Sequence, residues 1–113
     1  MRFLLASTGL GTIAALLATP ASAETVISTA VTTPVLTGTA GDDIRITSAG
    51  SVKPTGGAAV TINSNDSVKN EGTIAIKGAN SATGILANTN LTGDITNTGT
   101  ITIDEDFTGT DAD

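Results

Sequence analysis

One block of sequence occurs twice in this chain of 113 residues, with an offset of 27 positions. Asn70-Glu71-Gly72-Thr73-Ile74-Ala75-Ile76 returns as Asn97-Thr98-Gly99-Thr100-Ile101-Thr102-Ile103. When 57–76 is aligned with 84–103, seven positions are identical, including Gly57 with Gly84 and Asn63 with Asn90. A period of this size with polar turns indicates a solenoid, in which matching residues of successive coils lie over one another.

Each repeat has the pattern of short β-strands. β-Branched residues alternate with polar ones, and each run is bounded by Gly, Asn, Asp or Ser, which favour turns. The expected strands of one coil are 58–62, 67–69 and 73–77, and those of the next are 85–87, 94–96 and 100–103. The sequence therefore predicts an all-β fold, a parallel β-helix of about two to three coils.

The repeat also predicts which residues stack. Equivalent residues of adjacent coils should lie about 4.8 Å apart, with isoleucines inside, an asparagine ladder, and glycines at the corner between strands. The predicted columns are Asn70 under Asn97, Gly72 under Gly99, Ile74 under Ile101 and Ile76 under Ile103.

The chain divides into four segments by composition. We expect a signal peptide at 1–23, irregular strands that cap the solenoid at 24–41, β-helix repeats at 42–103, and an acidic tail that is a truncated loop at 104–113. Asp42 and Asp43 are interpreted as a solvated turn, because adjacent side chains on a strand diverge. The alternative for the repeats is low-complexity disorder, but a mean hydropathy of +0.23 and regular alternation favour folding.

The segment 1–23 has the features of a cleavable signal peptide. Arg2 is followed by an apolar stretch with the length of a signal-peptide helix, Pro20 interrupts it, and Ala21-Ser22-Ala23 matches the small-residue rule for cleavage between Ala23 and Glu24. The alternative is a transmembrane anchor, but Gly and Ser/Thr residues weaken the stretch. The pattern predicts export: periplasm in transit, then the cell surface, the outer membrane or the medium.

The composition argues against most kinds of catalytic site, metal site and nucleic-acid-binding site. The sequence has no Cys, His, Tyr or Trp, so thiolate and imidazole catalysis and His or Cys metal sites are excluded. The formal charge is −6, and Phe107 is the only aromatic residue after the signal peptide, which argues against nucleic-acid binding. We expect no enzyme activity, no catalytic residue and no cofactor.

The acidic tail is the one candidate metal site. Asp104, Asp106 and Asp111, with Glu105 and Asp113 nearby, could offer oxygen ligands to Ca²⁺. Their spacing does not match the EF-hand loop, so a solvated acidic end is the favoured interpretation.

The signal peptide and the Thr/Gly/Asn-rich strands together resemble the passenger region of bacterial autotransporters. The resemblance covers most of 24–106 and is carried by the Asn-x-Gly-Thr-Ile blocks, by Ile44-Arg45-Ile46-Thr47-Ser48-Ala49-Gly50-Ser51-Val52 and by Thr83-Gly84-Ile85-Leu86. It implies a right-handed β-helix displayed outside a Gram-negative cell, carried by a C-terminal outer-membrane β-barrel. This chain lacks barrel strands, so we expect the start of a longer protein or a truncated product.

Two functions are therefore expected. The first is an exported structural or adhesive surface module, non-catalytic in itself, that engages the export machinery and an unidentified host or surface ligand. The alternative is a fragment of a β-helical secreted enzyme, a polysaccharide lyase or protease passenger, with its active site in missing sequence. Unpaired strands at the open ends of a β-helix also predict self-association.

Overall fold

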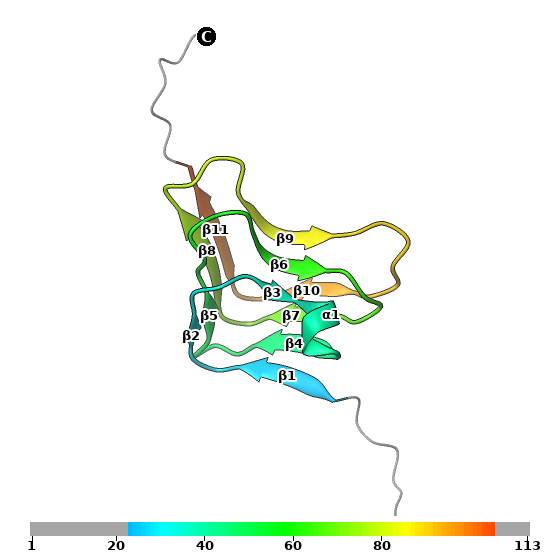
Figure 1. Ribbon diagram of the computed structural model, residues 1–113. Helices are drawn as coiled ribbons and strands as arrows, with labels where there is room; N and C mark the ends of the chain where they lie inside the picture. The colour runs from blue at the N-terminus through cyan, green and yellow to red at the C-terminus, as the bar shows by residue number, and fades with distance from the viewer. Residues whose placement is uncertain (1–22, 106–113) are drawn as a thin grey trace, which may run out of the picture.

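Three parallel β-sheets wind together into a solenoid in the computed structural model, which describes residues 23–105 (Figure 1). The strands of sheet A are, in spatial order, β1 (Glu24–Ile27), β4 (Asp43–Ile46), β7 (Val68–Asn70) and β10 (Ile95–Asn97). The strands of sheet B are β2 (Ala30–Val31), β5 (Ser51–Val52), β8 (Thr73–Lys77) and β11 (Thr100–Asp104). The strands of sheet C are β3 (Val35–Leu36), β6 (Ala58–Ile62) and β9 (Thr83–Ala87).

The chain visits sheets A, B and C in turn, and each circuit is one coil. Strands β1–β3, β4–β6 and β7–β9 make three coils, and β10 and β11 begin a fourth. All strand pairs are parallel. The prediction of an all-β parallel β-helix of about three coils is confirmed. Its right-handed sense, which connections between parallel strands almost always take, stays a prediction.

Between the third and fourth coils the repeat offset of 27 holds in sheets A and B, the two sheets that have a strand of the fourth coil within residues 23–105. Ile74 pairs with Ile101 and Ile76 with Ile103 across β8 and β11, and Asn70 pairs with Asn97 across β7 and β10. Sheet C pairs only the first three coils within these residues, and there Val60 of the second coil pairs with Ile85 of the third, an offset shorter than 27. The predicted match of Gly57 with Gly84 is therefore wrong, since Ala58 pairs with Thr83; the loop between β9 and β10 is longer than the one between β6 and β7 and restores the offset.

The solenoid begins earlier than the expected residue 42. Strands β1, β2 and β3 form a complete first coil, and Glu24 pairs with Asp43, which is a much shorter offset than that of the later coils. In sheet A the offset therefore grows from coil to coil, whereas in sheet C it stays the same. The interpretation of Asp42 and Asp43 as a solvated turn also needs correction, because Asp43 begins β4 and is half-buried.

The core is a set of stacked aliphatic columns. Its fully buried members include Ile44, Ile46, Val52, Ile74 and Ile76, each at most 1% exposed. Burial of one such side chain stabilises the fold by about 1.5–3 kcal/mol. A narrow interior filled by β-branched residues explains how 23–105 form a core with no aromatic side chain.

Glycines form a column at the corner between sheets A and B. A Cβ atom built on Gly50 would lie 2.0 Å from the Ile27 carbonyl oxygen of the coil before it. A Cβ on Gly72 would lie 2.2 Å from the Thr47 oxygen, and one on Gly99 would lie 2.2 Å from the Gly72 oxygen. The corner requires glycine because successive backbones approach closely there.

The connection from sheet C back to sheet A holds a buried hydroxyl. Thr37 opens α1 (Thr37–Ala40), a single turn that ends at Gly41 in the left-handed conformation, φ 78°. The Thr37 hydroxyl oxygen accepts hydrogen bonds from the backbone of Asn63 (3.1 Å) and from the Ser64 hydroxyl (2.7 Å). These bonds join the first coil to the second.

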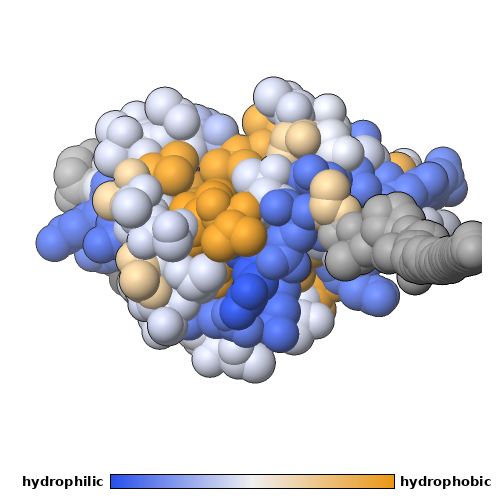
Figure 2. All heavy atoms as spheres, turned by 90° about the horizontal axis from the view of Figure 1, so that it is seen from below, coloured by the Kyte–Doolittle hydropathy of each residue, from blue (hydrophilic) through white to orange (hydrophobic). Residues whose placement is uncertain are grey.

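The end of the solenoid made by β1–β3 is seen in Figure 2. Apolar side chains gather in the middle of this end, and hydrophilic ones lie beside them. Within residues 23–105 we find no helix with the length and apolar character that a membrane span needs.

Candidate functional site

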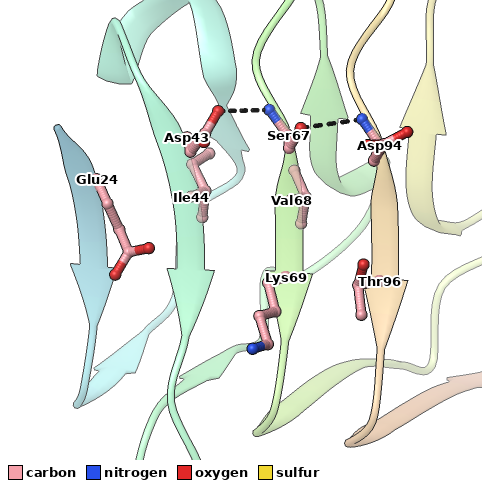
Figure 3. A pocket seen from close by; sticks show the side chains of 8 residues that line it. All are labelled: Glu24, Asp43, Ile44, Ser67, Val68, Lys69, Asp94 and Thr96. Atoms are coloured by element: carbon pink, nitrogen blue, oxygen red, sulfur yellow. Dashed lines mark hydrogen bonds between the residues drawn. The ribbon is translucent and has the colours of Figure 1, made fainter. Parts of the chain in front are cut away.

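A groove of about 240 Å³ crosses the four strands of sheet A (Figure 3). Polar residues at the start and middle of the strands line it, and buried aliphatic residues border it. The residues that line it are Glu24, Asp43, Ile44, Ser67, Val68, Lys69, Asp94 and Thr96. Two other hollows are lined by Lys77, Gly78, Asp104 and Glu105, and by Lys53, Pro54, Thr55, Ala75 and Lys77.

Parallel register places equivalent residues of successive coils, in or just before the strands of sheet A, in a row along the solenoid. Glu24, Asp43, Ser67 and Asp94 form the first row of the groove, because Glu24 pairs with Asp43 and the strands that follow keep the register. Val26, Arg45, Lys69 and Thr96 form a second row beside it. The face of sheet A thus carries a mainly acidic row beside a row whose two middle residues are basic.

The first row also links coils through hydrogen bonds. The Ser67 backbone N–H donates to Asp43 Oδ1 at 2.8 Å, and the Asp94 N–H donates to Ser67 Oγ at 3.0 Å. In both cases a side chain of one coil accepts from the backbone of the next. The hydrogen bonds of Asp43 and Ser67 therefore secure the register of the strands.

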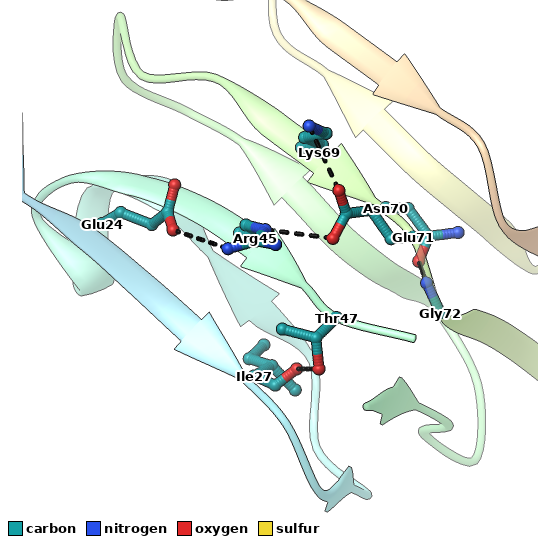
Figure 4. Close-up of polar contacts among 8 residues, drawn as sticks. All are labelled: Glu24, Ile27, Arg45, Thr47, Lys69, Asn70, Glu71 and Gly72. Carbon is teal, nitrogen blue, oxygen red and sulfur yellow. Dashed lines mark hydrogen bonds and ion pairs between the residues drawn. The ribbon is translucent and has the colours of Figure 1, made fainter. Parts of the chain in front are cut away.

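The second row is tied to Glu71, which follows β7 (Figure 4). Its carboxylate accepts a 3.0 Å hydrogen bond from Arg45 Nε and lies 3.1 Å from Lys69 Nζ. Arg45 also lies 3.6 Å from the carboxylate of Glu24. Four charged groups from three coils therefore form one network on the outer surface.

The network shifts the protonation of two of its members. Hydrogen bonds from Lys69 and Arg45 lower the pKa of Glu71 from the ordinary value of 4.5, so its carboxylate stays charged to more acidic pH. The hydrogen bond to Glu71 raises the pKa of Arg45 above its ordinary value. Both shifts favour the charged forms that attract each other.

The carboxylates of the groove are the groups in it that could act as acid or base catalysts. Asp43 and Asp94 lie two strands apart, about 9–10 Å by strand spacing, near the upper limit for the two carboxyl groups of an inverting glycosidase. However, Asp43 is engaged by the Ser67 N–H, and the charge of Glu24 faces Arg45. The arrangement therefore suits an ordered polar surface better than a pair of acid and base catalysts.

The structure places the residues of the repeat together, as columns inside the solenoid. Asn70, Gly72, Ile74 and Ile76 lie in the third coil, and Asn97, Gly99, Ile101 and Ile103 lie next to them in the fourth. Ala23 immediately precedes β1, and Glu24 is its first residue.

The candidate Ca²⁺ ligands are only partly described. Asp104 ends β11, and Glu105 accepts a 2.6 Å hydrogen bond from the Ser81 backbone. Asp106, Asp111 and Asp113 lie outside the described residues. Within 23–105, no three or more acidic side chains are grouped so that they could hold a metal ion.

The charged network was not predicted from the sequence. Arg45 pairs with Lys69, whereas the fixed repeat offset of the later coils would have placed Arg45 beside Gly72. The alternation of Ile44-Arg45-Ile46 and of Val68-Lys69-Asn70 is the signal that could have aligned these strands.

No protein-family model, curated protein or solved structure matches this chain. The fold is therefore established by the structure, and the resemblance to autotransporter passengers stays a prediction.

Proposed function

We propose that this chain is an exported structural or adhesive surface module, the N-terminal start of an autotransporter-like passenger, and non-catalytic in itself. The observation that carries the proposal is the alignment of outward side chains into continuous rows across the coils of sheet A. Solenoids present extended binding surfaces in this way, because each coil repeats the same outward positions at a fixed spacing.

The start of the solenoid is compatible with export. Cleavage after Ala23 leaves all of β1 in the mature chain, including the ion pair between Glu24 and Arg45. It also creates a new amino terminus at Glu24, at the edge of the sheet A groove. The partners of this proposal are the export machinery, an outer-membrane barrel and an unidentified surface ligand.

Export is tested by expressing the full chain in a Gram-negative host and measuring the mass of the recovered protein in each cell fraction. We expect a chain that begins at Glu24, outside the cytoplasm. The control is Ala23→Leu, which removes the small residue that cleavage requires and should give an uncleaved chain. Because Ala23 lies before β1, this substitution leaves the solenoid intact. A cytoplasmic protein that still begins at Met1 would contradict the proposal.

The second candidate is a fragment of a β-helical secreted enzyme, and the carboxylates of the sheet A groove are the observation in its favour. It is tested by release of reducing ends from acidic and neutral polysaccharides, with Asp94→Asn as the matched variant. If the full chain releases reducing ends and Asp94→Asn abolishes this release, the chain is an enzyme and the surface-module proposal is wrong.

A further inference from the structure

The C-terminal end of the solenoid is the surface formed by β9, β10 and β11, whose outer edges have no further strand within residues 23–105. Its inward-facing residues Ile95, Ile101 and Ile103 are 36% to 48% exposed. One coil earlier, the paired residues Val68, Ile74 and Ile76 are at most 1% exposed. An inward-facing position of sheet A or B is thus exposed to solvent at the end of the solenoid and becomes buried when one more coil lies over it.

The polar groups of this end repeat the pattern of the coil beneath. Asn70 donates a 2.7 Å hydrogen bond from its side-chain nitrogen to Asn97 Oδ1. Asn97 holds the equivalent position in the next coil, and within residues 23–105 its side-chain nitrogen makes only a 3.5 Å contact, with the Gly99 oxygen. It is therefore placed to donate to a third asparagine, as Asn70 donates to Asn97.

The glycine column at the corner between sheets A and B restricts which coil can stack on the C-terminal end. Gly50, Gly72 and Gly99 each sit on a backbone carbonyl of the preceding coil, so closely that a Cβ atom would be 2.0–2.2 Å from its oxygen. A coil that stacks on Gly99 in the same register needs glycine at this corner for the same reason.

The chain's own N-terminal end does not meet this requirement. The hydrogen bond from Ser51 N–H to the Thr29 oxygen matches those from Thr73 to Gly50 and from Thr100 to Gly72, so Thr29 is the corner residue of the first coil. Both ends of the solenoid are apolar, but only the first coil has a side chain at the corner. Within residues 23–105 no coil lies beneath Thr29, so no backbone carbonyl of these residues lies where its Cβ atom would clash.

We propose that the C-terminal end is a docking surface for one further β-solenoid coil with asparagine and glycine in the Asn-x-Gly arrangement of its corner, and that Thr29 excludes the chain's own N-terminal end from it. The expected coil has β-branched residues over Ile95, Ile101 and Ile103 and continues sheets A and B in parallel. Head-to-tail self-association, which open ends alone would predict, is blocked at this corner.

The test inserts a second copy of residues 78–104 directly after Asp104 in the full chain. The copy supplies an Asn-x-Gly corner, and we expect the melting temperature to rise by roughly 5 °C or more, with a steeper denaturant dependence of unfolding, as one more interface is formed. The matched control carries the same insertion with the copy of Gly99 changed to threonine, which reproduces the corner of the first coil. This control should unfold like the chain without an insertion.

Two results would overturn the proposal. The first is an insertion that leaves both the melting temperature and the denaturant dependence unchanged, which would show that the end does not accept a coil. The second is equal stabilisation by the insertion that keeps the copy of Gly99 and by the one that changes it to threonine. This would show that the corner does not require glycine. Both measurements depend on folding alone, so failed export would contradict the proposed function without affecting this result.

Discussion

The side-chain amide of Asn70 donates a 2.7 Å hydrogen bond to the side-chain oxygen of Asn97, its counterpart one coil further along. Asn70 is fully buried, and its own oxygen accepts a 3.1 Å hydrogen bond from the backbone N–H of Gly72. One side chain thus joins the third coil to the fourth and supports the turn at the corner. Inside an otherwise aliphatic core, such a group stabilises the fold only while its hydrogen bonds are made.

Asn70→Ala should lower the free energy of unfolding by about 2–3 kcal/mol, because it removes these bonds and leaves the buried Gly72 N–H without its acceptor. Urea unfolding of the full chain measures the change. The matched control is Asn88→Ala, which truncates an exposed asparagine and should cost less than about 0.5 kcal/mol. Equal effects of the two substitutions would show that the hydrogen bonds of the Asn70 side chain do not stabilise the fold.

Gly72→Ala tests the close approach of backbones at the corner. The new Cβ would lie 2.2 Å from the Thr47 oxygen and 2.3 Å from the Gly50 oxygen, and backbone atoms there cannot move aside without disturbing two coils. We expect a loss of about 3 kcal/mol or more in unfolding free energy. The control is Gly56→Ala, whose Cβ would make an ordinary 3.6 Å contact with Ala79 and should change stability by less than about 1 kcal/mol. A mild effect at Gly72 would contradict the corner geometry.

The third and fourth coils could be predicted because their strands carry the same block of residues. Asn70-x-Gly72 and Asn97-x-Gly99 align without a gap, and the β-branched residues after them define the inward face. The first coil could not be predicted, because β2 and β3 are too short to show alternation and its corner is Thr29. Its register depends on hydrogen bonds between distant segments, such as Ser51 N–H to the Thr29 oxygen, which leave no local pattern.

The sheet A groove and its charged network depend on variable spacing between coils. Turns of different length make the offset between paired residues of sheet A grow from each coil to the next, so side chains that meet in space do not recur at one period. Glu71 reaches Arg45 of the preceding coil only because β4 and β7 are aligned in this way. Predicting which side chains meet on the surface therefore requires the register of every coil. Predicting the core requires only the alternation of apolar and polar residues along each strand.

Ile74→Ala and Ile101→Ala compare one position in two successive coils. Ile74 is fully buried, so its truncation should cost about 2–5 kcal/mol through lost burial and the cavity left behind. Ile101 is 38% exposed, and its truncation should cost roughly 1 kcal/mol, because much of its side chain is already in contact with water. Chemical denaturation of the two variants gives the difference directly. Similar losses would mean that the fourth coil is covered in solution.

Glu71→Gln should make the stability of the chain less dependent on pH. Because folding lowers the pKa of Glu71, its ion pairs stabilise the fold fully above the unfolded value of about 4.5, and this contribution is lost as the pH falls through the lower folded value. At neutral pH the variant should melt a few degrees lower at most, since exposed ion pairs stabilise weakly.

The two melting curves should converge in acid, where Glu71 of the unmodified chain is protonated, and also in high salt. Thermal melts from about pH 7 to pH 3 measure the convergence. Arg45→Gln and the double variant complete the cycle, and the second substitution should have a smaller effect once the first is present. Additive effects at neutral pH, or a gap between the curves that widens in acid, would show that Glu71 does not act through Arg45 and Lys69.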